Sequence, residues 1–171
     1  MRSTIPKLTL IAVLAFLAGL GCRLIVRTKQ RNTVPDKYAK DADTWWIWGE
    51  NTYAGAYELF HPKKPGLWFS AAVLGHQALE MLLKAALIRK GHSVIQGDVW
   101  GHNLTKLAKL IASETAGFPP DIVANVGIFS DLFDELRYPK KLKKVKGLGE
   151  QEGKLLTTIV RVLRPYAKGD K

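Results

Sequence analysis

The fold is decided by residues 76–92, "HQALEMLLKAALIRKGH", which have the spacing of a helix and are apolar on nearly every side. One face carries Leu74, Ala78, Met81, Leu82, Ala85 and Ile88, and much of the opposite side carries Leu79, Leu83, Ala86 and Leu87. Such a helix is either the central helix of a bundle or partly a subunit interface. The remaining polar stripe contains Gln77, Glu80 and Lys84, and the last two have the spacing of a favourable i,i+4 ion pair.

Helical patterns flank this segment on both sides, and no part of the chain predicts a strand convincingly. The expected helices run over residues 36–60, 67–90, 103–115, 120–137 and 150–166, separated by "HPKKPG" (61–66), Gly91, "GFPP" (117–120) and "RYPKK" (137–141). Asn103 is a plausible N-cap of the third helix. The sequence therefore predicts an all-α fold, an up-and-down bundle of four to five helices preceded by an N-terminal hydrophobic helix.

The N-terminus is a hydrophobic segment that favours a membrane anchor. Residues 8–26 contain one charge, Arg23, and at about 1.5 Å per residue they are just long enough to span a bilayer. The flank after them is more basic than the flank before them, and the more basic side of a span tends to stay cytoplasmic. We therefore expect residues 1–26 to anchor the chain, 27–36 to form a basic linker, and 37–168 to form a cytoplasmic domain.

Two other interpretations of this segment stay open. One is an export signal, cleaved as in secreted proteins or processed as in lipoproteins with Cys22 as the acylated residue. The lipoprotein version is weakened by Gly19, which stands where that motif has Leu, Val or Ile. The other interpretation is a wrongly assigned start codon.

The charge of the chain favours anionic partners. The 171 residues carry a net charge of +11, and the pI is about 9.8, which suits nucleic acid, nucleotides or an anionic membrane face. Residues 1–40 account for +7 of this charge, so much of the basicity lies outside the expected bundle.

Three segments in order resemble the HEPN family, the higher eukaryotes and prokaryotes nucleotide-binding domain. They are "AAVLGHQALEMLLKAALIRKGH", "HNLTKLAKLI" and "DLFDELRYPKK", and the similarity extends over about residues 37–168. The resemblance implies a four- or five-helix bundle that is often a homodimer and is often encoded beside a small nucleotidyltransferase. Family members bind nucleotides or RNA, and many are ribonucleases or the toxins of toxin–antitoxin pairs.

One part of the family pattern is missing. The ribonuclease branch has an arginine followed four to six residues later by a histidine, which can act as acid or base while the arginine steadies phosphate charge. The matching arginine is Arg137, and the residues after it include Tyr138, Pro139 and several lysines but no histidine. We therefore expect a non-catalytic module that binds a nucleotide, RNA or a partner protein. The alternatives are a ribonuclease with an atypical site and a purely structural dimerisation module.

The candidate ligand-binding residues share a basic or hydrogen-bonding side chain and a position in these motifs. They are Arg137, Tyr138, Lys84, His102, Lys140, Lys141, Lys143 and Lys144. Each has a simpler structural interpretation, which the sequence favours. Lys84 would be a solvated lysine paired with Glu80, and His102 would be a residue at a helix start that bonds to nearby backbone. Arg137 would be a positive charge placed favourably at the C-terminus of a helix. The lysine run would be a solvated loop. The tryptophans would be core or dimer-interface residues rather than base-stacking ones.

Other chemistries find little support in the sequence. No "GxxxxGK" phosphate loop and no Gly-x-Ser-x-Gly elbow occurs. The four histidines include no pair three or four residues apart on one helix, and a lone Cys22 makes neither an internal disulfide nor a zinc site. We therefore expect neither a metal nor a cofactor.

The anchor hypothesis predicts a topology that can be measured. Alkaline phosphatase fused after Lys171 should be inactive, because the domain would stay in the cytoplasm, and the protein should fractionate with the inner membrane. An active fusion, or a mature chain beginning at Cys22 by mass spectrometry, would contradict this expectation.

Overall fold

The computed structural model describes residues 40–170 except 62, 64, 96 and 138–147. The hydrophobic N-terminal segment, the basic linker and the lysine run therefore lie outside the described residues. The described part contains the helices α2 (Ala42–Leu59), α3 (Trp68–Arg89), α4 (Leu104–Glu114), α5 (Pro120–Arg137) and α6 (Glu150–Lys168), together with 3-10 turns at Pro65–Leu67 and Gly97–Val99. No strand occurs among these residues, so the all-α prediction is confirmed for the described domain.

The helix bounds agree with the sequence prediction within a few residues, except at the start of the first helix. That helix begins at Ala42 rather than at residue 36, because Asp41 is its N-cap. The carboxylate of Asp41 accepts hydrogen bonds from the backbone N–H of Thr44 at 3.1 Å and from its hydroxyl at 2.6 Å. These hydrogen bonds lower the pKa of Asp41 below its ordinary value.

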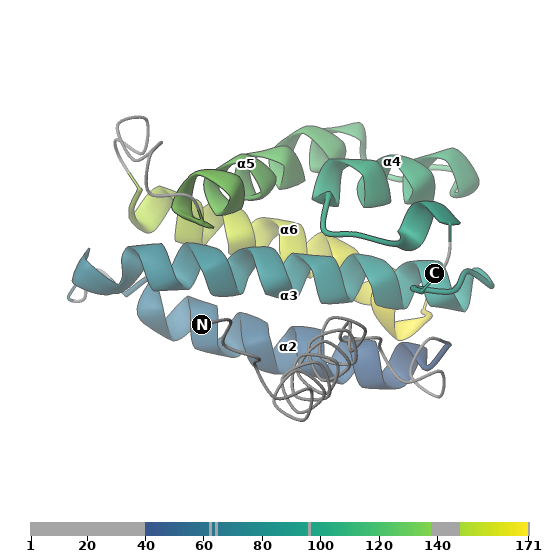
Figure 1. Cartoon of the computed structure of the whole chain (residues 1–171), viewed down its shortest axis with the longest axis horizontal. Coiled ribbons are helices and arrows are strands. Elements are labelled where there is room, and N and C mark those ends of the chain that lie inside the picture. The colour runs from purple at the N-terminus through teal and green to yellow at the C-terminus, as the bar shows by residue number, and fades with distance from the viewer. Residues whose placement is uncertain (1–39, 62, 64, 96, 138–147, 171) are drawn as a thin grey trace, which may run out of the picture. The chain divides into compact units, whose positions relative to one another are not determined.

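Helix α3 is the centre of the bundle and contacts each of the other four helices (Figure 1). Helix α2 lies antiparallel along it, while α4, α5 and α6 cover its other sides. Of its 22 residues, 14 are buried, and Leu83 and Leu87 are fully covered within the chain. Of the two interpretations of this helix, the structure therefore supports the central helix, and these two leucines do not lie at a subunit interface.

The length and apolar composition of α3 would also suit a membrane-spanning helix. Among the described residues, α3 is the one helix long and apolar enough to cross a membrane, and 78% of its apolar stretch is buried inside the protein. It is therefore a core helix of the bundle rather than a span.

Helices α2 and α6 meet along a close seam. A Cβ atom on Gly153 would lie 2.9 Å from the Cβ of Phe60, so only glycine allows this approach. Farther along the seam, the hydroxyl of Tyr53 donates to Thr157 at 3.2 Å. The guanidinium of Arg164 then holds both carboxylate oxygens of Glu50 at 2.8 Å, which favours its charged form and raises the pKa of Arg164.

The burial of Leu83 leads to a stability prediction. Leu83→Ala should lower the free energy of unfolding by about 2–5 kcal/mol, because it leaves a cavity in the core. Leu83→Asp should prevent folding rather than release monomers, since it would bury an unpaired carboxylate. Urea unfolding measures the first effect, and Ile47→Ala on the exposed face of α2 is the control, expected within about 0.5 kcal/mol of the unmodified chain. A well-folded Leu83→Asp protein would contradict the central placement of α3.

Candidate functional site

Three polar side chains lie in the core on successive turns of α3. His76, Glu80 and Lys84 are 1%, 8% and 5% exposed. The spacing of four residues places them on one face of the helix. Charged groups are stable at such depth only when they are paired and hydrogen-bonded.

Glu80 is the centre of this polar cluster. Its Oε1 accepts a hydrogen bond from the Nζ of Lys84 at 2.7 Å, and its Oε2 lies 2.8 Å from Nδ1 of His102. The ammonium of Lys84 also lies 5.3 Å from the centroid of the Trp45 ring, within the range of a cation–π interaction. One carboxylate thus joins α3 to the segment before α4.

His102 is the exposed member of the cluster. It directly precedes Asn103, which caps α4 by accepting from the backbone N–H of Lys106 at 2.8 Å, so the cap fixes the backbone beside the histidine. Because an ionised carboxylate only accepts hydrogen bonds, Nδ1 of His102 must carry the proton that faces Glu80. The imidazole is 66% exposed. Its Nε2 is therefore the atom available to a ligand, as an acceptor when the ring is neutral and as a donor when it is protonated.

His76 holds the cluster against α5. Its Nδ1 lies 3.2 Å from the backbone carbonyl of Phe129, and its ring stacks on Phe133 with centroids 4.0 Å apart and planes 12° apart. The Nε2 atom lies 3.9 Å from Oε2 of Glu80. His76 thus keeps α3 and α5 in register around the carboxylate.

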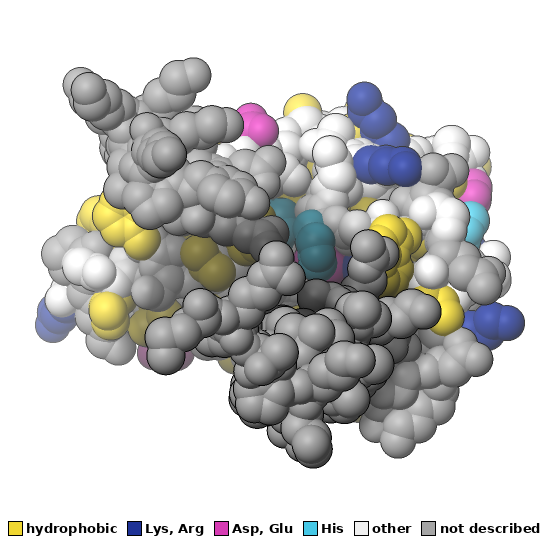
Figure 2. All heavy atoms as spheres, viewed as in Figure 1, with side chains coloured by type: hydrophobic (Ala, Val, Ile, Leu, Met, Phe, Trp, Pro, Cys, Tyr) yellow, Lys and Arg dark blue, Asp and Glu magenta, His cyan; other side chains and the backbone are white. Residues whose placement is uncertain are grey.

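Glu80 and His102 border a cavity of about 560 Å³, here called the His102 cavity. Its walls combine aromatic, apolar and polar side chains, namely Trp45, Val73, Gln77, Glu80, Met81, His102 and Phe133. On the face drawn in Figure 2, histidine atoms are visible near the middle of the molecule, close to hydrophobic side chains. A cavity of this size, with mixed lining and a few convergent polar groups, is typical of a small-ligand site.

Of the predicted site residues, the structure brings two together and leaves the side chains of the others outside the described part of the chain. Lys84 and His102 come together through Glu80, whereas Arg137 ends α5 with its side chain outside the described residues. Tyr138 and the lysines of the run, Lys140, Lys141, Lys143 and Lys144, also lie outside them.

Two structural interpretations from the sequence were wrong in part. Lys84 pairs with Glu80 as predicted, but it is buried instead of solvated, because Trp45 covers it from α2. His102 bonds to a side chain from α3 instead of nearby backbone. The tryptophans were predicted to lie in the core or at a dimer interface; Trp45 lies in the core, whereas Trp48 is 42% exposed within the chain.

His76 was not predicted as a member of the site. The signal for it was the i, i+4, i+8 spacing of His76, Glu80 and Lys84 within an apolar helix.

Within the described part of the chain, no group of three His, Cys, Asp or Glu side chains could hold a metal ion. The imidazole of His102, held by Glu80 at 2.8 Å, is suited to hydrogen bonding and proton exchange.

The buried ion pair of Glu80 and Lys84 predicts that substitutions of its two residues have non-additive effects on the free energy of unfolding. Lys84→Met should lower the free energy of unfolding by about 3–5 kcal/mol, because it leaves the carboxylate of Glu80 without its main partner. Adding Glu80→Gln should recover part of that loss, since the buried charge is then removed. Urea unfolding of the two single variants and the double variant measures the coupling. Strictly additive losses would contradict the pairing described for Glu80 and Lys84.

A family model described as the HEPN domain matches residues 42–164, from the first residue of α2 into the last turns of α6. No curated protein and no solved structure matches the chain.

Proposed function

The chain belongs to the HEPN domain family, and on that premise we propose that it is a non-catalytic helical module that binds the phosphate of a nucleotide or of RNA beside His102. The observation that carries the proposal is the hydrogen bond from His102 to the Glu80 carboxylate at 2.8 Å. It directs Nδ1 inward and leaves Nε2 facing solvent. A protonated imidazole so held donates a charge-assisted hydrogen bond to an anion.

The surroundings of His102 suit a phosphorylated ligand. The charge of Glu80 is already offset by Lys84 at 2.7 Å, so the carboxylate does not oppose an incoming anion as a free one would. The exposed lysines Lys106 and Lys109 lie in the first turns of α4, shortly after His102, and their spacing of three residues places them on the same face of that helix. The aromatic side chains of Trp45 and Phe133 and the exposed amide of Gln77 border the cavity and can contact a base.

The proposed module is non-catalytic because the family's ribonuclease pair is incomplete. After Arg137 the chain offers tyrosine, proline and lysines, and an unperturbed lysine with a pKa near 10.4 is a poor base at neutral pH. A second candidate, a ribonuclease with an atypical site, has one observation in its favour. His102 is oriented by a carboxylate, which is the arrangement that general acid–base catalysis uses.

The remaining parts of the proposal concern partners. The family resemblance supports a homodimer and, as an interacting protein, a small nucleotidyltransferase, in a toxin–antitoxin pair or a related two-gene system. The hydrophobic residues 8–26 support attachment to the membrane by a single span with the bundle in the cytoplasm.

Binding and cleavage of RNA by the full chain, purified in a non-ionic detergent, test the proposal. The protein should bind labelled single-stranded RNA weakly, with an affinity that falls as salt rises, and should not cleave it. His102→Ala should weaken binding severalfold, as should replacing Lys140, Lys141, Lys143 and Lys144 together by Ala. Fluorescence anisotropy over a range of salt concentrations measures both effects.

His92→Ala is the matched control, because His92 bonds to Glu114 at 3.0 Å and does not line the His102 cavity. Equal losses in His92→Ala and His102→Ala would overturn the binding site. Cleavage by the unmodified protein that disappears in both His102→Ala and Arg137→Ala would establish the ribonuclease instead.

A further inference from the structure

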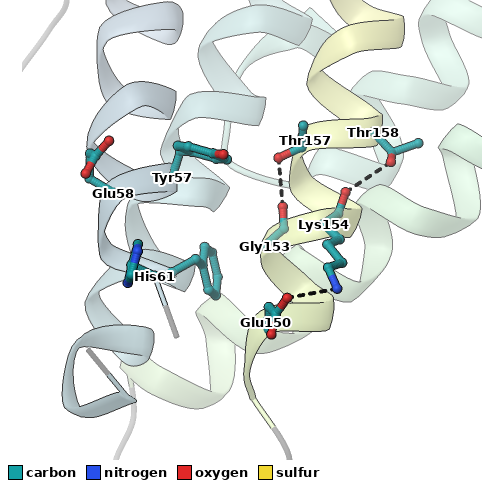
Figure 3. Close-up of a pocket in the computed structure, with 9 residues that line it drawn as sticks. Tyr57, Glu58, His61, Glu150, Gly153, Lys154, Thr157 and Thr158 are labelled. Carbon is teal, nitrogen blue, oxygen red and sulfur yellow. Dashed lines mark hydrogen bonds and ion pairs between the residues drawn. The ribbon is translucent and has the colours of Figure 1, made fainter. Parts of the chain in front are cut away.

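A second cavity opens at one end of the seam between α2 and α6, and no residue of the His102 cavity lines it. It has a volume of about 410 Å³ and is here called the Phe60 pocket. Its lining consists of Tyr57, Glu58, Phe60 and His61 from the end of α2, and of Glu150, Gly153, Lys154, Thr157 and Thr158 from the start of α6 (Figure 3).

The inner surface of this pocket is aromatic and offers few free hydrogen-bonding groups. Phe60 is buried against Gly153, where the chain after α2 approaches α6 closely. The hydroxyl of Thr157 donates to the carbonyl of Gly153 at 2.9 Å and accepts from Tyr53, and Thr158 donates to the carbonyl of Lys154 at 3.0 Å. These hydroxyls are thus occupied by the protein itself. The inner surface of the pocket therefore favours an apolar or aromatic group.

Tyr57 provides the exposed aromatic surface of the pocket. Its side chain extends from α2 toward Thr157 of α6 in Figure 3, and the residue is 56% exposed. An exposed tyrosine ring attracts an organic cation through the negative charge density of its face. A ligand that enters the pocket would lie against this ring.

The charges around the Phe60 pocket favour a cation. Glu58 stands on the α2 side and Glu150 on the α6 side, with Lys154 as the one ammonium among the lining residues. Lys154 holds Glu150 at 2.8 Å, while Glu58 pairs with no other side chain in the part of the chain that the structure describes. The pocket thus carries a net negative charge on a chain whose net charge is +11. Charge complementarity and the aromatic lining point to the same kind of ligand.

We propose that the Phe60 pocket binds an organic ammonium carried on an apolar stem, with the stem against Phe60 and the cation at the exposed ring of Tyr57, attracted by the carboxylates of Glu58 and Glu150 at the rim of the pocket. This site is independent of the nucleotide or RNA site proposed at His102. The shared chemistry of its ligand, an alkylammonium group, occurs both in free amines and in the lysine side chains of partner proteins.

Titration of the full chain with phenethylammonium and with its neutral analogue 2-phenylethanol tests the proposal. The ammonium should shift the methyl resonances of Thr157 and Thr158 and should bind more tightly than the alcohol. Glu58→Gln should weaken ammonium binding about fivefold, the effect of losing one charge contact at a protein surface. Lys154→Gln should strengthen it by a similar factor, because Glu150 is then free to contact the ligand.

Two exposed residues outside the pocket provide matched controls. Asp131→Asn and Lys168→Gln make the same charge changes on α5 and at the end of α6 and should leave the affinity unchanged. The substitutions at Glu58 and Lys154 should preserve the helical circular dichroism, since both side chains lie on the surface. Equal binding of the amine and the alcohol, or shifts in affinity of the same sign in Glu58→Gln and Lys154→Gln, would overturn the proposal.

Competition distinguishes the two sources of the cation. Spermidine that displaces the probe at a lower concentration than a lysine-containing peptide would identify a free amine as the natural type of ligand. The opposite order would identify a side chain of a partner protein. Failure of both to displace the probe would contradict the ammonium site.

Discussion

The carboxylate of Glu80 is the constraint around which the rest of the structure is arranged. It lies in the middle of the most buried helix, where an unpaired negative charge would cost several kcal/mol. Lys84 from the same helix and His102 from the segment before α4 approach it as donors, and Trp45 from α2 covers the lysine. The position of one charged group therefore dictates where two neighbouring elements must lie.

This arrangement also explains why the exposed histidine is well oriented. Imidazoles at protein surfaces are usually free to rotate, but the ring of His102 is held at one nitrogen by a carboxylate that is itself fixed by a buried lysine. The orientation of the surface group is thus supplied by the core. An imidazole held in this way would lose little binding energy to ordering on contact with the proposed ligand.

Much of the fold was predictable because its signals are local. Apolar spacing and the breaks at Gly91 and in "GFPP" located the helices, and the Asn103 cap was visible in the sequence and is confirmed by the structure. The Glu80–Lys84 pair was also visible, because it lies within one helix. Its burial was not, because the residue that covers it, Trp45, comes from another helix. The contact between Tyr53 and Thr157, which are 104 residues apart, had no local signal at all, and the same holds for the pocket beside it.

The charges of Glu80 and Lys84 on α3 also bear on how the chain behaves while it is being synthesised. This helix leaves the ribosome before α4, α5 and α6, so the residues that later cover it are not yet available, and it is apolar enough to resemble a membrane span. A charged side chain near the middle of a helix adds about 2.5–3.5 kcal/mol to the cost of its insertion through the translocon. Glu80 and Lys84 lie near the middle of α3. The residues that organise the folded core would therefore also act during translation as a signal against membrane insertion, directing this helix to the aqueous side until its partners arrive.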